Sequence, residues 1–106
     1  MFENFWDNVK VLLRMKEITM RELAEKTGLN FHSLYNSVSK QILPSVESLY
    51  KLANAFDVSM EYLLTGIDKY NPSMNIENLK KKYIEIKKAE YESELTRKLD
   101  RLSELK

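Results

Sequence analysis

The sequence contains no cysteine, one histidine, two glycines and two prolines among its 106 residues. Without cysteine it offers no disulfide, no thiolate metal ligand and no thiol nucleophile, and a single histidine does not build a zinc site unaided. No apolar stretch approaches the roughly 20 residues that span a bilayer. The N-terminal stretch MFENFWDNVK is acidic and aromatic, unlike a basic leader with an apolar core. We therefore expect a cytoplasmic protein without a bound metal and without a membrane partner.

Features that support catalysis are also missing. The sequence shows no paired nucleophile and base and no phosphate-cradling glycine loop. The length allows one small domain and an appendage, because domains usually run to about 100 to 150 residues. We expect no enzymatic activity and no cofactor.

The run TMRELAEKTGLNFHSLYNSVS, residues 19–39, predicts two short helices joined by a tight turn. Thr19 and Glu22 have the spacing of a capping box, in which each side chain bonds the other residue's backbone N–H. Gly28 is suited to the left-handed conformation that ends a helix, and Asn30 is suited to cap the next one. The pattern is typical of proteins that place a helix in the DNA major groove.

The order Ala24, Gly28, Leu34 resembles the helix-turn-helix of the lambda-repressor and Cro-like regulators, often called the XRE family. The resemblance continues through PSVESLYKLANAFDVSMEYLLTG, residues 44–66, and covers roughly residues 4–66. It implies an all-α fold, with a compact five-helix DNA-binding domain over residues 1–66.

Apolar spacing places the other helices of this domain. A first helix is expected over about residues 3–16, a fourth from near Ser45, and a short last one from Ser59 to Gly66. The expected inward side chains of the first helix are Phe5, Val9, Leu12 and Leu13. Those of the fourth helix are Val46, Leu49, Leu52, Ala53 and Phe56.

A linker over residues 67–74 precedes a segment, residues 75–106, that lacks glycine and proline. We expect this segment to be helical, with Asn75 as its cap. Its two short apolar stripes need a covering surface, and our hypothesis is a homodimer. The candidate dimer residues are Ile76, Leu79, Tyr83, Ile86, Leu95, Leu99 and Leu102. The alternatives are packing on the chain's own domain, fraying in solution, or binding another protein.

DNA contacts are assigned by the direction of side chains and by the family resemblance. The candidates for base contacts, on the outward part of the second helix of the motif, are Phe31, His32, Tyr35 and Asn36. The candidates for phosphate contacts are Arg21, Asn30, Ser33, Lys40, Arg14 and Lys16. For Phe31 the alternative is a packing role against Leu34 and Tyr35.

Two features depart from the family pattern. Ser37 occupies a position that often holds a large apolar residue, and acids slightly outnumber bases up to Gly66. This scarcity of positive charge predicts that DNA affinity depends on the local placement of the cations and on dimerisation.

The resulting hypothesis is a sequence-specific transcriptional regulator, a repressor that binds double-stranded DNA at a palindromic operator as a homodimer. The alternative is a protein-interaction module, or an antitoxin-like protein that binds a partner with the same fold. In that case Phe2, Trp6 and the C-terminal helix would supply the apolar surface, although Phe2 and Trp6 could equally be buried against that helix.

Overall fold

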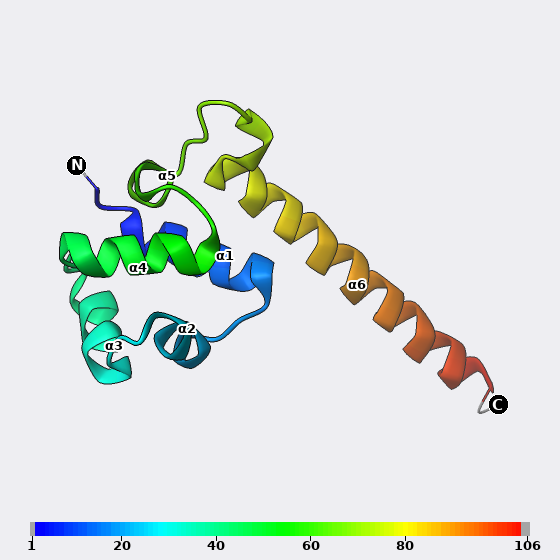
Figure 1. Ribbon diagram of the computed structural model, residues 1–106. Coiled ribbons are helices and arrows are strands. Elements are labelled where there is room, and N and C mark those ends of the chain that lie inside the picture. The colour runs from blue at the N-terminus through cyan, green and yellow to red at the C-terminus, as the bar shows by residue number, and fades with distance from the viewer. Residues whose placement is uncertain (1, 105–106) are drawn as a thin grey trace.

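The computed structural model describes residues 2–104, and all regular secondary structure in this part of the chain is helical (Figure 1). The elements are α1 (Phe5–Lys16), α2 (Met20–Thr27), α3 (Phe31–Lys40), α4 (Val46–Phe56), α5 (Met60–Thr65), the 3₁₀ turn η1 (Pro72–Met74) and α6 (Ile76–Glu104). The predicted all-α class, with five helices followed by a helical extension, is confirmed. The outermost residues of the predicted segments 1–66 and 75–106, which are residues 1, 105 and 106, lie outside the described residues.

Short polar side chains start four of these helices. The N-cap oxygens accept a hydrogen bond from the backbone N–H three residues on, at 3.0 to 3.2 Å, in Thr19, Asn30, Ser45 and Ser59. Each cap satisfies a donor that the first helical turn leaves without a partner. One detail of the predicted capping box is wrong, because the Glu22 carboxylate accepts from the Thr19 hydroxyl, at 3.2 Å, instead of from its backbone N–H.

Helix α1 lies inside the domain and is buried on more than one face. The predicted stripe is buried, and so are Trp6, Asn8 and Val11. Trp6 packs edge to face on Phe5, with 4.8 Å between ring centroids, and its indole N–H donates to the Ile42 carbonyl at 2.8 Å. Trp6 is only 1% exposed, so the expectation that it offers a partner surface is wrong. It anchors the loop that follows α3.

Helix α4 presents the predicted inward face with one exception. Leu49, Leu52, Ala53 and Phe56 are buried, but Val46 is 75% exposed. Val46 is the first residue of the helix and lies on the flank of the stripe, so the core does not reach it.

The start of α6 is part of the domain core. Ile76 and Leu79 are 3% and 5% exposed, and the Ile76 N–H donates to the Gly66 carbonyl at 2.9 Å. Asn75 does not use its side chain to cap α6 as predicted, because its Oδ1 accepts from the Asp68 N–H at 2.7 Å. The first turns of α6 are thereby fixed to α1 and α5.

The packing of α6 buries some of the seven predicted dimer residues and leaves the others exposed. Ile76 and Leu79 are already covered within the chain, Tyr83 is half-buried, and Ile86 is partly exposed. Beyond Tyr83 every side chain up to Leu102 is exposed, and α6 projects from the domain, giving the molecule a longest dimension of 62 Å (Figure 1). Ile76 and Leu79 are therefore unavailable for an exposed dimer face, which corrects that part of the prediction.

The two glycines provide a matched test of this junction. Both have φ of +73°, but a Cβ on Gly28 would meet nothing within 4 Å, whereas on Gly66 it would lie 3.1 Å from Ile76 Cγ1. We expect Gly28→Ala to lower the free energy of unfolding by about 1 kcal/mol through backbone strain alone. Gly66→Ala should lower it by about 2–3 kcal/mol, because crowding adds to the same strain. Chemical denaturation of both variants measures the difference, and equal losses would contradict close packing of α6 on α5.

Candidate nucleic-acid interface

Helices α2 and α3 form a rigid pair against α4. Leu23 and Ala24 of α2 and Leu34 and Val38 of α3 are buried in one core cluster. Gly28 ends α2 in the left-handed conformation, as predicted, and two residues later Asn30 caps α3. Both helices are thus held by their apolar faces, which leaves the opposite face of α3 free.

That free face carries the predicted base-contacting residues. His32, Tyr35 and Asn36 are exposed, and His32 and Asn36 lie one helical turn apart on the same side. Ser33 and Lys40 are exposed on the same helix. In this way α3 presents imidazole, phenol, amide, hydroxyl and ammonium groups, which together can bond base edges and phosphates.

Phe31 has a mixed environment. Its ring is half-buried against the core cluster, and its centroid lies 6.1 Å from that of Tyr35. The Arg21 guanidinium stacks over the ring, 4.3 Å from the centroid. Such a cation–π contact holds the cation of α2 beside the first turn of α3. The structure therefore brings Arg21 to the candidate interface and gives Phe31 the packing contacts that were its alternative role.

The remaining phosphate candidates differ in position. Asn30 uses its side-chain oxygen as the α3 cap, so its amide NH₂ is the group left for a ligand. Lys16 is exposed at the end of α1. Arg14 lines a hollow of about 180 Å³ together with residues of α6, which places it beside α6.

A group of hydroxyls beside α3 was not anticipated. A hollow of about 240 Å³ opens between α3 and the start of α4, and its polar lining comprises Asn30, Ser33, Ser37, Ser45 and Ser48. Ser37 donates to the Ser33 carbonyl at 3.1 Å, so the serine that departs from the family pattern contributes to this polar surface. The serines are visible in the sequence, but their convergence depends on how α4 packs on α3.

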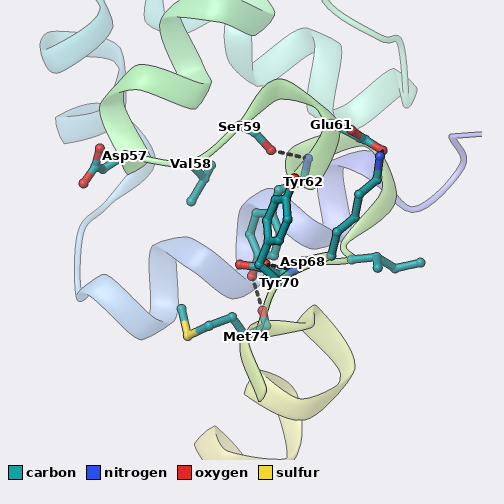
Figure 2. A pocket seen from close by; sticks show the side chains of 10 residues that line it. Asp57, Val58, Ser59, Glu61, Tyr62, Asp68, Tyr70 and Met74 are labelled. Atoms are coloured by element: carbon teal, nitrogen blue, oxygen red, sulfur yellow. Dashed lines mark hydrogen bonds and ion pairs between the residues drawn. The ribbon is translucent and has the colours of Figure 1, made fainter. Parts of the chain in front are cut away.

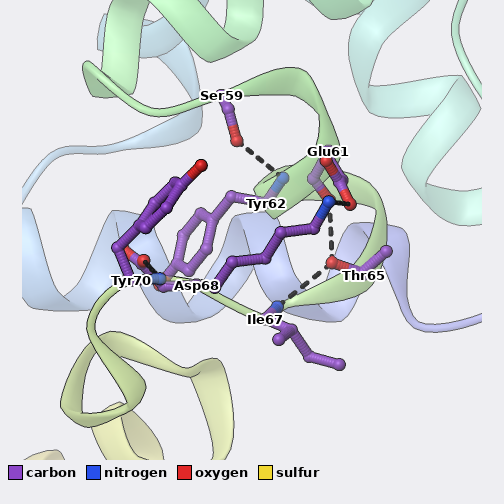
Figure 3. Close-up of polar contacts among 8 residues, drawn as sticks. Ser59, Glu61, Tyr62, Thr65, Ile67, Asp68 and Tyr70 are labelled. Atoms are coloured by element: carbon purple, nitrogen blue, oxygen red, sulfur yellow. Dashed lines mark hydrogen bonds and ion pairs between the residues drawn. The ribbon is translucent and has the colours of Figure 1, made fainter.

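A larger hollow, of about 450 Å³, lies beside α5 and the segment before η1 (Figure 2). Tyr62 donates its hydroxyl to the Met74 carbonyl there, and its pKa is raised by burial and then by the nearby charge of Asp68. Figure 3 shows Asp68 accepting from the Tyr70 N–H, beside the cap bond that the Tyr62 N–H donates to the Ser59 hydroxyl. These bonds shape the connection from α5 to α6.

Neither a metal-binding cluster nor a membrane-spanning helix is found among the described residues. Among residues 2–104, no three His, Cys, Asp or Glu side chains come together as a metal ion would require. None of the helices in the same part of the chain has the length and apolar character needed to cross a bilayer.

Comparison with known proteins agrees with this geometry. Residues 7–69 match a family model described as a helix-turn-helix domain. The uncharacterized HTH-type transcriptional regulator YobD of Bacillus subtilis (strain 168) is 33% identical over 78 residues, which cover 72% of this chain and 68% of the relative.

The uncharacterized HTH-type transcriptional regulator YqaE of the same organism is 31% identical over 64 residues, covering 58% of this chain and 53% of the relative. The match thus spans about half of the second relative's length. No solved structure matches the chain significantly.

Proposed function

The chain belongs to the XRE-type helix-turn-helix family, and on this basis we propose that it is a transcriptional regulator that binds double-stranded DNA with α3 in the major groove. The observation that carries the proposal is the exposed face of α3, held on a buried α2–α3 pair. We further propose that it acts as a homodimeric repressor on a palindromic operator in the cytoplasm. Occupancy of a promoter excludes polymerase without chemistry, so this role needs neither a cofactor nor catalysis.

The base-reading roles follow from side-chain chemistry. Asn36 can donate and accept in the plane of an adenine edge, and His32 can bond a guanine. Tyr35 reaches a base edge or the backbone, and the exposed edge of Phe31 suits a thymine methyl.

The phosphate-binding roles follow from charge and position. Arg21, Ser33 and Lys40 are placed for phosphates, together with the NH₂ group of Asn30. Lys16 and Arg14 lie farther along α1 and would contact phosphates only outside the central groove. Because the domain has few cations, the positions of the individual cations matter more for DNA affinity than its net charge.

Dimerisation compensates for this modest charge. When two linked DNA-binding domains bind one duplex, the second binding step becomes intramolecular, which raises avidity by orders of magnitude. We propose residues 1–66 as the reading domain, 67–74 as the connection, and 75–106 as the segment that supplies the dimer contact.

Selection of bound sites from random DNA tests the proposal. We expect enrichment of one sequence with two-fold symmetry, and an observed binding constant that falls steeply and linearly with salt on logarithmic axes. Lys40→Ala should weaken binding to all sequences and reduce the salt slope by about 1, whereas Lys51→Ala on α4 serves as the control. Failure to enrich any sequence would contradict the DNA-binding role.

The exposed length of α6 favours a second candidate, a protein-interaction module with the same fold. In that case a partner protein would bind α6 while the α3 face made no sequence-specific contact. Site selection separates the two, because only a DNA-binding regulator enriches a sequence and loses it when α3 is altered.

A further inference from the structure

Helix α6 has two different apolar faces. The first, formed by Ile76, Leu79 and Tyr83, packs on the domain. The second consists of exposed side chains, Ile84, Tyr91, Leu95, Leu99 and Leu102, which we call the distal stripe. Their exposed fractions range from 44% to 66%, so the described part of the chain leaves much of each side chain uncovered.

The distal stripe is interrupted by Lys88 and Lys98, and beyond Ile84 it lies away from the domain. On a helix with about 3.6 residues per turn, its side chains fall within an arc of roughly 80°, centred roughly 120° from the packed face. Ile84, at its domain end, also lines the hollow that contains Val11 and Arg14. From Tyr91 to Leu102 a second helix could lie along the stripe without meeting the domain that carries it.

We propose that the distal stripe pairs with the same stripe of a second copy of this chain, with the two α6 helices parallel. The inference rests on the homodimer of the proposed function and defines its contact surface. The stripe fits two positions of a heptad: Lys88, Leu95 and Leu102 occupy one, and Ile84, Tyr91 and Lys98 occupy the other. These two positions form the seam along which the two helices would meet, and Leu99 lies beside it.

Charged residues on the two sides of the seam favour pairing with a second copy and set the relative direction of the two helices. Lys80 and Lys87 lie on one flank, and Glu85 and Glu92 lie on the other, each pair one heptad apart. In a parallel pair the first flank faces the second flank of the other helix, so Lys80 meets Glu85 and Lys87 meets Glu92 across the seam. Because the proposed dimer is two-fold symmetric, each of these ion pairs forms twice.

An antiparallel pair does not give this match. Centred on the stripe, it would set each flank against the same flank of the other copy, so that Glu92 faces Glu92 and Lys87 faces Arg101. Parallel pairing also leaves both reading domains at the same end of the seam, where two α3 helices can reach one duplex.

The existing contacts of these charges do not prevent the pairing. Lys87 bonds Glu90 at 3.3 Å and Lys80 bonds Glu77 at 3.5 Å, both on the exposed surface of the same helix. Exposed pairs of this kind contribute little, so exchanging them across a dimer costs little. Lys88 and Lys98 within the seam weaken it, while a polar residue at such a position favours a defined register.

The absence of cysteine permits a direct test on the full chain. In a parallel pair Leu102 lies beside Leu102 of the other copy, within disulfide reach, whereas antiparallel pairing centred on the stripe separates them by roughly 25–30 Å. We expect Leu102→Cys to form a covalent dimer on oxidation. Ser93→Cys, on the opposite side of the same helix, is the matched control and should form no covalent dimer on oxidation.

Charge variants test the flanks by sedimentation. Lys87→Glu and Glu92→Lys should each raise the dimer dissociation constant by about three- to tenfold, and the double variant should restore it, because each single change places like charges across the seam. Lys82→Glu makes the same charge change on the other side of α6 and should leave dimerisation unchanged.

The outcomes are distinguishable from failure of the DNA role, since neither measurement contains DNA. A monomeric wild-type chain, equal crosslinking of Leu102→Cys and Ser93→Cys, or a dimer in which Leu102→Cys does not crosslink would overturn the proposed pairing. A crosslinked parallel dimer that enriches no DNA sequence would support the pairing and contradict the proposed function.

Discussion

Replacement of Trp6 by alanine is expected to lower the free energy of unfolding by about 3–5 kcal/mol, the range for removing a large aromatic side chain from a core. Trp6 is 1% exposed and contacts Phe5, so the deletion leaves a cavity in the middle of the domain. A domain of this size has only about 5–15 kcal/mol of stability in total. Urea denaturation should show a lower midpoint, with much of the protein unfolded at physiological temperature.

Trp6→Phe separates packing from hydrogen bonding. It keeps most of the apolar contact but removes the indole N–H that donates to Ile42. We expect an intermediate loss of about 1–3 kcal/mol, because the deletion leaves the Ile42 carbonyl without that donor. If Trp6→Ala proved as stable as the wild type, the central placement of α1 would be wrong.

Replacement of Asn36 by alanine is expected to weaken binding to the selected operator by about 1–3 kcal/mol per half-site, the discrimination supplied by a good bidentate base contact. For a homodimer the loss counts twice, so specific binding should fall by orders of magnitude while nonspecific binding at low salt persists. Asn36 is exposed, so stability should change little. Fluorescence anisotropy with operator and scrambled duplexes measures both affinities.

Asn54→Ala is the matched control, since it makes the same substitution at an exposed position near the end of α4. It should leave both affinities unchanged. Equal effects of the two substitutions, or an Asn36→Ala protein with unchanged preference among sequences, would remove Asn36 from the reading role.

Local signals in the sequence were sufficient for most of the helix boundaries. Thr19, Asn30 and Ser59 cap the helices that they were predicted to cap, and Gly28 and Gly66 end theirs in the left-handed conformation. These interactions join residues within one turn of each other, so they are set by neighbours along the chain.

The environment of α1 was less predictable. The apolar period identifies one face of an amphipathic helix, but α1 is covered on several sides, and Trp6 and Asn8 are buried outside that face. Asn8 is buried because its NH₂ group finds the Leu63 carbonyl, 55 residues away along the chain, at 3.0 Å. Asparagine is mostly exposed in proteins, so nothing local signals such a contact.

The candidate DNA-contacting residues could be chosen from sequence because a helix with a fixed buried face has a fixed outward face. Once Leu34 and Val38 are inside, His32 and Asn36 are outside. The hydroxyl hollow beside α3 could not be chosen in this way, since Ser33 and Ser48 meet only through the packing of separate helices.

The sequence by itself determined the helices, most of their caps and the outward face of α3, because these depend on propensity, periodicity and contacts within a few residues. Only the tertiary structure decided which apolar residues of α6 remain free. Periodicity gave two short stripes, one with Ile76 and Leu79 and one with Leu102, and both were assigned to a dimer, but α1 and α5 bury Ile76 and Leu79 and leave Leu102 exposed. The physical reason is that an apolar stripe specifies a need for burial, whereas its partner is selected by the long-range packing of the whole chain.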